Sequence, residues 1–452
     1  MQNTRHFSTI TCYMNRNFGL KKFEADKVAL LGLFMLSLLI AHMIVSVKSA
    51  IVFSEPIELI HTGLSISIPV GNGWKSKKKW EYQANTFTLS SNFTLNTNGP
   101  TASAYCQYLI DTETIPHKLW FEQKAAEING TIVETGQDQA DTLTIDWAHI
   151  EGPELLLNSF LGAIELPYNR RLNIEVHQIT SEVDMAEKVF KQILSSLNFE
   201  ENQLFKTGSE IIETIKNKGL DSFIDNQYQQ SYFLIKDSRS LTIGFMIDVL
   251  TDSDLDDEFN ILAAGHFYGR GLREQAIRFR CGNNLNEFVW ESETNSMAGR
   301  NHTEIILDEA GIMTVRESKA QTELKYRLSP AAIPDIFLEM LLNQMIESNT
   351  KQIIIDIVDA GGKITPTLAC VIEENISAEE DAAYVIKLEF LDGQGFSELI
   401  YLNNQRKIDR AIVQQNKRYI LETTTREDIV REFPERSDFL SQKNNILGEN
   451  AF

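Results

Sequence analysis

Apolar and polar residues alternate from Leu64 to Val70, and Gly71, Asn72 and Gly73 follow directly. A period of two predicts a strand with one buried face, and the glycine-rich triplet predicts the turn that ends it. The same alternation predicts strands at 143–150 and 172–177, whereas helical spacing predicts helices at 117–128 and 181–197. The lysine-rich segment 75–80 is expected to be an exposed loop. Together these elements predict an α+β sandwich domain over 55–202.

The pattern changes after a polar stretch at 200–230. From there to residue 422 one alternating run follows another, with turn residues between them, which predicts an antiparallel meander. One helix, 333–345, interrupts the strands, and its apolar stripe consists of Ile333, Ile336, Phe337, Met340, Leu341 and Met345. Because an open curved sheet must cover its concave face, we expect this helix to plug a β-rich antiparallel half-barrel over 205–435, with Phe337 packed into the concavity.

The most apolar segment of the chain runs from Val28 to Val47 and contains no Asp, Glu, Lys or Arg. As a helix it would span about 30 Å, the thickness of a bilayer core, so the pattern predicts an N-terminal transmembrane helix at 28–47. The flank before it is basic, which favours a cytoplasmic tail at 1–27 and extracytoplasmic C-terminal domains in a single-pass membrane protein. A signal peptide cleaved before Ala50 is the alternative. The polar tail, 436–452, is expected to be disordered.

Net charge excludes one class of function. The 452 residues include 42 basic and 63 acidic side chains, which leaves a charge of −21. A general nucleic-acid binder needs a basic surface, so we expect no nucleic-acid partner. The cysteines Cys12, Cys106, Cys281 and Cys370 are too few for a disulfide framework. The last three are expected to be mainly buried free thiols, although their odd number leaves pairing with another chain open.

No motif in the sequence predicts a catalytic, cofactor-binding or metal-binding residue. Gly361, Gly362 and Lys363 lack the spacing of a phosphate loop and predict a hairpin turn. The acidic run 252–257 lacks the glycine and glutamate of a calcium loop. Asp146 and His149 are expected to point to opposite faces of one strand, and the histidines show no metal-ligand spacing. The stripe containing Phe337 and Met340 is expected to be core, with the lining of an apolar cavity as the alternative.

Two blocks of the chain resemble known families. The strand 64–69 before Gly73 and Trp74, the helix that ends at Gly130 and the closing helix to Leu197 resemble the PsbP-like α/β/α sandwich family. The long meander, the helix 333–345 and the closing run 401–434 resemble half-barrel proteins related to lipoprotein carriers, together with bacterial domains of unknown function. These resemblances imply the two folds. They transfer no functional residue, because neither family has a catalytic signature to carry over.

The sequence therefore predicts a membrane-anchored, non-enzymatic, exported protein that binds an apolar ligand or another envelope protein, without a cofactor. A hydrolase with loop-borne carboxylates and a purely structural envelope scaffold are the alternatives. A pocket distinguishes them, since convergent buried carboxyl groups would favour the enzyme and an apolar cavity beneath the helix would favour the binder.

Overall fold

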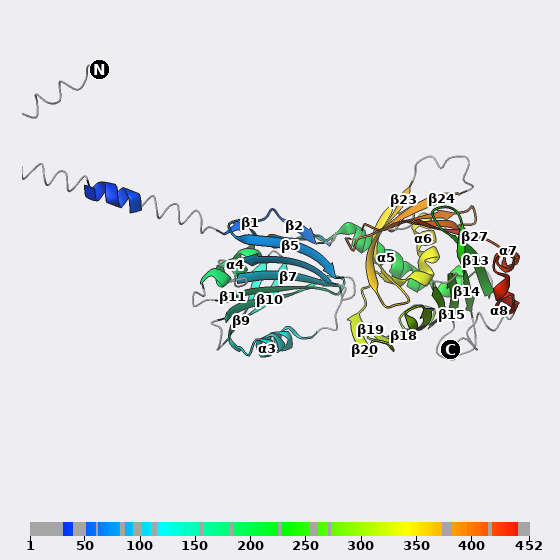
Figure 1. Ribbon diagram of the computed structural model, residues 1–452, viewed down its shortest axis with the longest axis horizontal. Coiled ribbons are helices and arrows are strands. Elements are labelled where there is room, and N and C mark those ends of the chain that lie inside the picture. The colour runs from blue at the N-terminus through cyan, green and yellow to red at the C-terminus, as the bar shows by residue number, and fades with distance from the viewer. Residues whose placement is uncertain are drawn as a thin grey trace, which may run out of the picture.

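The computed structural model describes residues 30–38, 51–59, 62–81, 86–93, 102–110, 115–140, 142–152, 157–179, 184–224, 228–252, 261–269, 273–372, 382–393, 395–414 and 418–441. Two main sheets, antiparallel except for one pair of strands, lie next to each other (Figure 1). We call the first the N-terminal sheet and the second the large sheet.

The N-terminal sheet is covered by one helix on each face. It contains β5 (Trp74–Glu81), β6 (Thr86–Phe93), β7 (Ala102–Ile110), β8 (Thr131–Ala140), β9 (Leu143–Gly152), β10 (Leu157–Leu166) and β11 (Arg170–Ile179), in the spatial order β5-β6-β7-β11-β10-β9-β8. The helices are α3 (His117–Glu127) and α4 (Asp184–Ser195). Two small sheets contain β1 (Val52–Phe53), β2 (Ile57–Leu59), β3 (Leu64–Ile66), β4 (Pro69–Val70) and β12 (Asn198–Phe199).

Neighbouring residues of β10 show how the two faces are filled. The ring of Phe160 lies 5.7 Å from that of Phe190 in α4, whereas Leu161 packs in a cluster with Trp120 of α3. Because consecutive side chains of a strand point to opposite faces, α4 and α3 cover opposite faces of the sheet. The continuous burial of β10 also explains why alternation did not reveal this strand.

The lysine-rich segment 75–80 belongs to β5, so the expected loop is wrong. β5 stands at the end of the strand order, and Lys75, Lys77 and Lys78 are exposed on it. Lysines on an edge strand hinder pairing with a second chain, which accounts for a strand with this composition.

The large sheet contains most of the chain after residue 228. Its strands are β13 (Tyr228–Lys236), β14 (Thr242–Asp252), β15 (Ile261–Gly269), β16 (Arg273–Cys281), β17 (Phe288–Ser296), β18 (Gly299–Leu307), β19 (Ile312–Glu317), β20 (Thr322–Arg327), β21 (Ala332–Pro334), β22 (Gln352–Val358), β23 (Ile364–Ile372), β24 (Tyr384–Phe390), β25 (Ser397–Leu402), β26 (Ile408–Gln414) and β27 (Arg418–Thr423). The spatial order runs from β20 back to β13, continues at β27 and runs back to β21. The large sheet therefore consists of two meanders joined where β13 pairs with β27, with Phe233 opposite Thr423.

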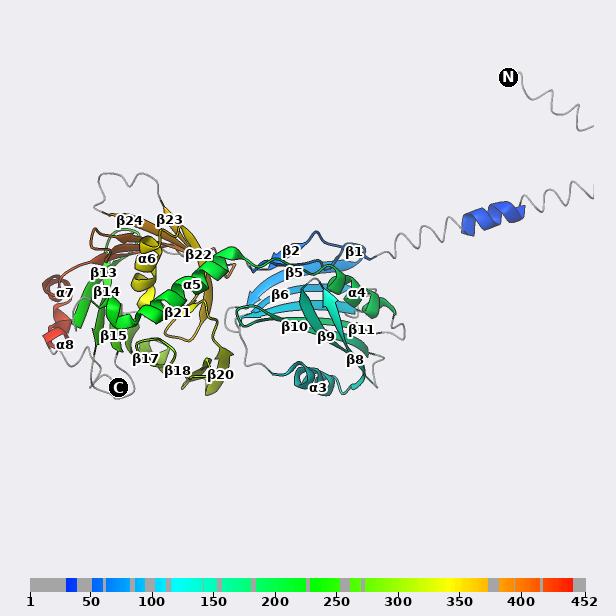
Figure 2. The same ribbon diagram turned by 180° about the vertical axis from the view of Figure 1, so that it is seen from behind.

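Seven helical segments of the described residues accompany the large sheet. They are α5 (Gln203–Lys218), the 3-10 helices η2 (Leu220–Phe223), η3 (Asp335–Phe337) and η4 (Pro434–Arg436), and the helices α6 (Leu338–Glu347), α7 (Arg426–Glu432) and α8 (Ser437–Ser441). The helix α5 connects the N-terminal sheet to the large sheet. Figure 2 shows α5 leading from the N-terminal sheet toward α6. Gly208 lets α5 approach β22, because a Cβ there would lie 2.1 Å from the carbonyl oxygen of Ile354.

The helix expected at 333–345 is divided in the structure. Ile333 lies in β21, which pairs in parallel with β22, then η3 follows, and the α-helix itself begins at Leu338. Phe337 is fully buried, and its ring lies 5.3 Å from that of Phe279 in β16. The expected burial of Phe337 is confirmed, but it packs against β16 of the large sheet and not into the concavity of a half-barrel.

The expected fold class is wrong as stated. No helix in the described part of the chain is long and apolar enough to cross a membrane. Within 28–47 the structure describes residues 30–38, which are helical. The rest of that segment and the tail 1–27 lie outside the described residues. The lack of such a helix among the described residues also contradicts the expected localisation as a single-pass membrane protein.

The second correction concerns the sheet. The sequence predicted a half-barrel plugged by a helix for the C-terminal part of the chain. The structure has instead a single sheet of 15 strands, β13 to β27. Local alternation predicted many of its strands but not their order, because the pairing of β13 with β27 joins segments far apart in the sequence. Within 436–452, α8 is described and Leu440 is buried against Phe245 and Phe433, while 442–452 lie outside the described residues.

The two main sheets share a buried ion pair. The Arg170 guanidinium, at the start of β11, donates to the carboxylate of Asp356 in β22, and both side chains are almost completely buried. The guanidinium also lies over the ring of Phe205 in α5, 5.5 Å from its centroid. Next to it, the Asn169 side chain donates to the carbonyl oxygen of Leu328 at 2.9 Å. Polar contacts thus fix the N-terminal sheet against the large one.

Candidate functional site

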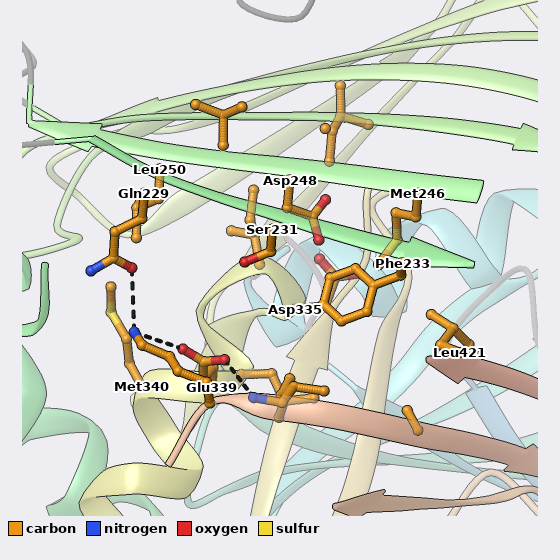
Figure 3. Close-up of a pocket in the computed structure, with 18 of the residues that line it drawn as sticks. Gln229, Ser231, Phe233, Met246, Asp248, Leu250, Asp335, Glu339, Met340 and Leu421 are labelled. Carbon is orange, nitrogen blue, oxygen red and sulfur yellow. Dashed lines mark hydrogen bonds and ion pairs between the residues drawn. The ribbon is translucent and has the colours of Figure 1, made fainter. Parts of the chain in front are cut away.

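A cavity of about 430 Å³ lies between the large sheet and α6 (Figure 3). Its walls come from β13 to β16 on one side and from β25 to β27 on the other, and η3 with α6 closes it. Most of the wall is apolar. Pockets of roughly 300–1,000 Å³ with this mixture of apolar walls and a few polar groups are typical ligand sites.

The period of two in β14 decides which side chains enter the cavity. Met246, Asp248 and Leu250 line it. Phe245 and Ile247, one position out of phase, pack on the opposite face against α7 and α8. The inward position of the Asp248 carboxyl group is therefore fixed by burial of its apolar neighbours on the other face.

A glycine makes room for this carboxyl group. Gly265 of β15 lies directly opposite Asp248, and Ile277 of β16 lies opposite Gly265 on the other side. A Cβ at Gly265 would lie 2.7 Å from the Ile277 side chain and 3.1 Å from a carboxyl oxygen of Asp248. Any other residue at position 265 would force its neighbours to move.

Three carboxyl groups converge on the cavity from separate parts of the chain: Asp248 in β14, Asp335 in η3 and Glu398 in β25. Burial raises the pKa of Asp248 to about 7, and the charge of Glu339 adds to this. Burial likewise raises the pKa of Glu398 to about 7. Taking a carboxylate out of water penalises its charged form, so these two acids are about half protonated at neutral pH.

The Asp335 carboxyl group points toward that of Asp248 in Figure 3. Asp335 is an exposed residue on the cavity, yet desolvation by the surrounding protein raises its pKa well above the usual range. The charges of Asp359, Asp248 and Glu398 raise it further, while a hydrogen bond from the Ile336 amide opposes the shift. The charges of Asp248 and Glu398 thus act on Asp335, and we call these three acids the acid cluster (Asp248, Asp335 and Glu398).

A polar contact closes one side of the cavity. The Lys407 ammonium lies 3.2 Å from a carboxylate oxygen of Glu339 in α6 and donates to the side-chain oxygen of Gln229 in β13 at 3.4 Å (Figure 3). The other Glu339 carboxylate oxygen accepts from the Ile408 amide at 2.9 Å. The positive charge of Lys407 is therefore paired with Glu339.

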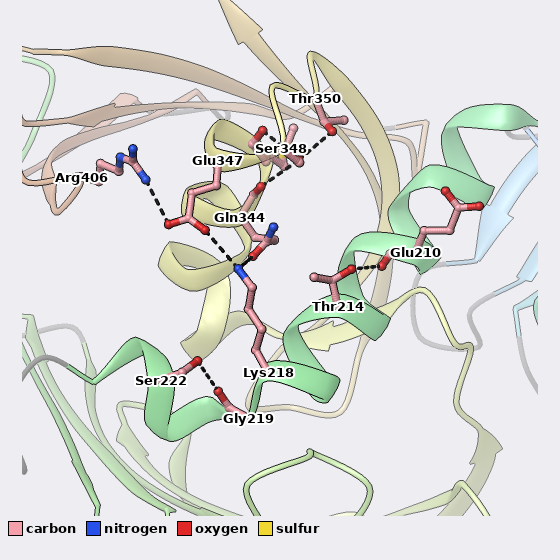
Figure 4. A network of polar contacts seen from close by, with 11 residues as sticks. Glu210, Thr214, Lys218, Gly219, Ser222, Gln344, Glu347, Ser348, Thr350 and Arg406 are labelled. Atoms are coloured by element: carbon pink, nitrogen blue, oxygen red, sulfur yellow. Dashed lines mark hydrogen bonds and ion pairs between the residues drawn. The ribbon is translucent and has the colours of Figure 1, made fainter.

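A second network holds α6 over the cavity. Lys218, at the end of α5, donates to the side-chain oxygen of Gln344 at 2.6 Å and contacts Glu347 at 3.2 Å (Figure 4). Arg406, from the turn between β25 and β26, contacts the other Glu347 oxygen at 3.1 Å. The helix is tied to two other elements, so the cavity is preformed.

No protein-family model matches the chain, and no curated protein sequence matches it significantly. Among solved structures, it is similar to a β-barrel-like protein of domain of unknown function DUF1849 from Brucella abortus, at 11% identity over 44% of this chain and 95% of that one, with a TM-score of 0.34. A DUF1089 family protein from Pseudomonas aeruginosa matches at 10% identity over 41% of this chain and 89% of the other, with a TM-score of 0.20.

A protein from Bacteroides thetaiotaomicron matches at 10% identity over 37% of this chain and 62% of the other, with a TM-score of 0.22. None of these three structures is described as PsbP-like. The likeness is to β-rich proteins and is loose, so the chain's own strand pairing defines its fold.

The stripe on 333–345 was expected to be core, with cavity lining as the alternative, and Ile336 and Met340 do line the cavity. Phe337, Leu341 and Met345 are fully buried core residues. The hairpin turn at Gly361 and Gly362 is confirmed, because it connects the paired strands β22 and β23, and Gly362 has a φ of +77°. Residues 253–257 of the acidic run lie outside the described residues.

The cysteines behave largely as expected. Cys106 and Cys281 are buried free thiols, and burial raises the pKa of Cys106 to about 12. Cys370 is a free thiol that is half-buried, and Cys12 lies outside the described residues.

Two histidine clusters in the N-terminal sheet are structural. His117 lies between Asp146, at 2.5 Å, and Glu165, at 2.8 Å, and these hydrogen bonds raise its pKa. The ring of His177 contacts the Ser159 hydroxyl at 2.8 Å and Glu175 at 3.2 Å. This trio resembles a hydrolytic triad, but Ser159 is fully buried and no substrate could reach it.

Proposed function

We propose that the protein binds a small amphipathic molecule in the cavity between the large sheet and α6, without converting it chemically. The observation that supports this most directly is the cavity itself, about 430 Å³ of preformed space with apolar walls and a few polar groups at fixed positions. An apolar ligand body would replace water along Phe233, Met246 and Leu421, and each buried CH₂ group contributes about 0.8 kcal/mol to binding.

Filling the cavity should abolish binding. Met246→Trp places a larger ring where Met246 now lines the space, so the variant should bind an uncharged environment-sensitive fluorophore, such as N-phenyl-1-naphthylamine, at least tenfold more weakly than the unsubstituted chain. A fluorescence titration of the full chain measures this.

Leu241→Trp is the matched control, because Leu241 is 55% exposed and does not line the cavity. It should leave the titration unchanged. If the unsubstituted chain does not bind the fluorophore, the binding proposal is wrong, and a structural role would be favoured.

The acid cluster favours a hydrolase as the second candidate, since an acid with a pKa of about 7 suits general acid–base catalysis at neutral pH. In that case the full chain should release p-nitrophenol from a panel of p-nitrophenyl esters and glycosides, and Asp248→Asn should stop the release. Rates equal to those in buffer alone would contradict this candidate.

A further inference from the structure

The cavity has an excess of acidic groups that its own residues do not balance. Its charged or titratable lining residues are Asp248, Asp335, Glu339 and Glu398 against Lys407 and His266. Lys407 contacts Glu339. Burial and the charge of Arg436 lower the pKa of His266 to about 4, so its ring is neutral at pH 7. Asp359, behind Asp335, adds one more acid. Its charge interacts with those of Lys363 and Arg273.

The acid cluster is also short of hydrogen-bond partners. Within the described residues, no group donates a hydrogen bond to the Asp248 or Glu398 carboxyl group, and both residues are half-buried. Their accessible surface faces the cavity. In the lining, the buried side-chain oxygen of Asn343 also lacks a donor. The carboxyl groups therefore present acceptors to the cavity, and a ligand in it would supply the donors.

We propose that the molecule bound in this cavity is a cationic amphiphile, with a protonated amine held by Asp248, Asp335 and Glu398 and an apolar body along the walls of the large sheet. This rests on the proposed binding function and specifies its ligand class. An ammonium group carries three donors and one positive charge, which complement unpaired carboxylates. In the described part of the chain, no group of three acidic, histidine or cysteine side chains could hold a metal ion.

The affinity for a cationic amphiphile should depend on pH. In the empty cavity, Asp248 and Glu398 lose their protons near pH 7. A bound ammonium stabilises the ionised carboxylates, so binding releases protons and becomes stronger as the pH rises from 6 to 8. The expected gain is about tenfold for each carboxyl group that loses its proton on binding. An aliphatic amine stays protonated throughout, because its pKa is about 10.

Three probes with the same chain separate the ligand classes. Decylamine, decan-1-ol and decanoate displace the uncharged fluorophore from the full-length protein, each below its micelle concentration and at constant ionic strength. Decylamine should bind at least tenfold more tightly than decan-1-ol at pH 8, and only decylamine should bind more tightly at pH 8 than at pH 6. Decanoate should bind more weakly as the pH rises, because its carboxylate meets ionised acids.

Two substitutions test whether the preference for the amine comes from the acid cluster. Asp248→Asn and Glu398→Gln should each reduce the preference for decylamine over decan-1-ol while the uncharged fluorophore remains bound, whereas Glu309→Gln, in an exposed turn, should change nothing. If a variant does not fold, the pH dependence of decylamine binding to the unsubstituted chain still tests the proposal. Equal affinity for the amine and the alcohol at pH 8 would overturn the cationic ligand and leave the binding function standing, whereas no displaceable fluorophore at all would overturn both.

Discussion

Phe337→Ala should lower the free energy of unfolding by about 3–5 kcal/mol. Phe337 is fully buried at the end of η3, and its ring packs edge-on against Phe279 of the large sheet. Removal of the ring leaves a void beneath α6 that the strands, held by their ladder hydrogen bonds, cannot collapse to fill. Urea denaturation of the full chain, followed by tryptophan fluorescence, measures the change.

Leu324→Ala is a suitable comparison, because Leu324 lies in β20 and is 44% exposed. It should shift the urea midpoint much less than Phe337→Ala. Equal shifts for the two variants would show that Phe337 does not occupy the core position described above.

Arg170→Met should destabilise the protein by about 3–5 kcal/mol, because it leaves the Asp356 carboxylate buried without its counter-charge between the two main sheets. The apolar side chain of Met fills much of the space but cannot donate to the carboxylate. The loss should be visible as a lower thermal midpoint, and Asp356→Leu alone should show a comparable loss, since it leaves the guanidinium buried without its counter-charge.

The double variant Arg170→Met/Asp356→Leu tests the cause. Replacement of both partners by apolar groups removes the uncompensated charge, so most of the stability should return. Arg316→Met, which removes an exposed pair with Glu304 and Glu323, should leave the midpoint unchanged. If the double variant is as unstable as the sum of the single ones, loss of packing and not of charge balance would be responsible.

Local patterns in the sequence predicted individual elements better than their arrangement. Alternation revealed strands with one polar face, such as 143–150, which falls within β9. It did not reveal β10, whose residues are buried along almost its whole length, or the lysine-rich β5. It also joined β21, η3 and α6 into one helix, because a short buried strand and a buried helix have the same apolar composition.

The apolar part of the site was within reach of the sequence, as Met340 shows, but the acid cluster was not identified. Asp248, Asp335 and Glu398 are widely separated in sequence, and only the long-range pairing of the large sheet brings their strands together. One signal was present. Asp248 interrupts the apolar run from Phe245 to Leu250, and an acid inside a buried strand is costly without a compensating role.

The pairing of β13 with β27 has a consequence for how the protein is made. The first strand of the large sheet finds this neighbour only when the last strand, Arg418–Thr423, has been synthesised. Until then, β14 protects one edge of β13 and the other remains open to pairing with a second nascent chain. The cavity, whose opposite walls meet at this seam, is therefore among the last features to form. A chain that ends before residue 418 should aggregate rather than form a smaller binding protein.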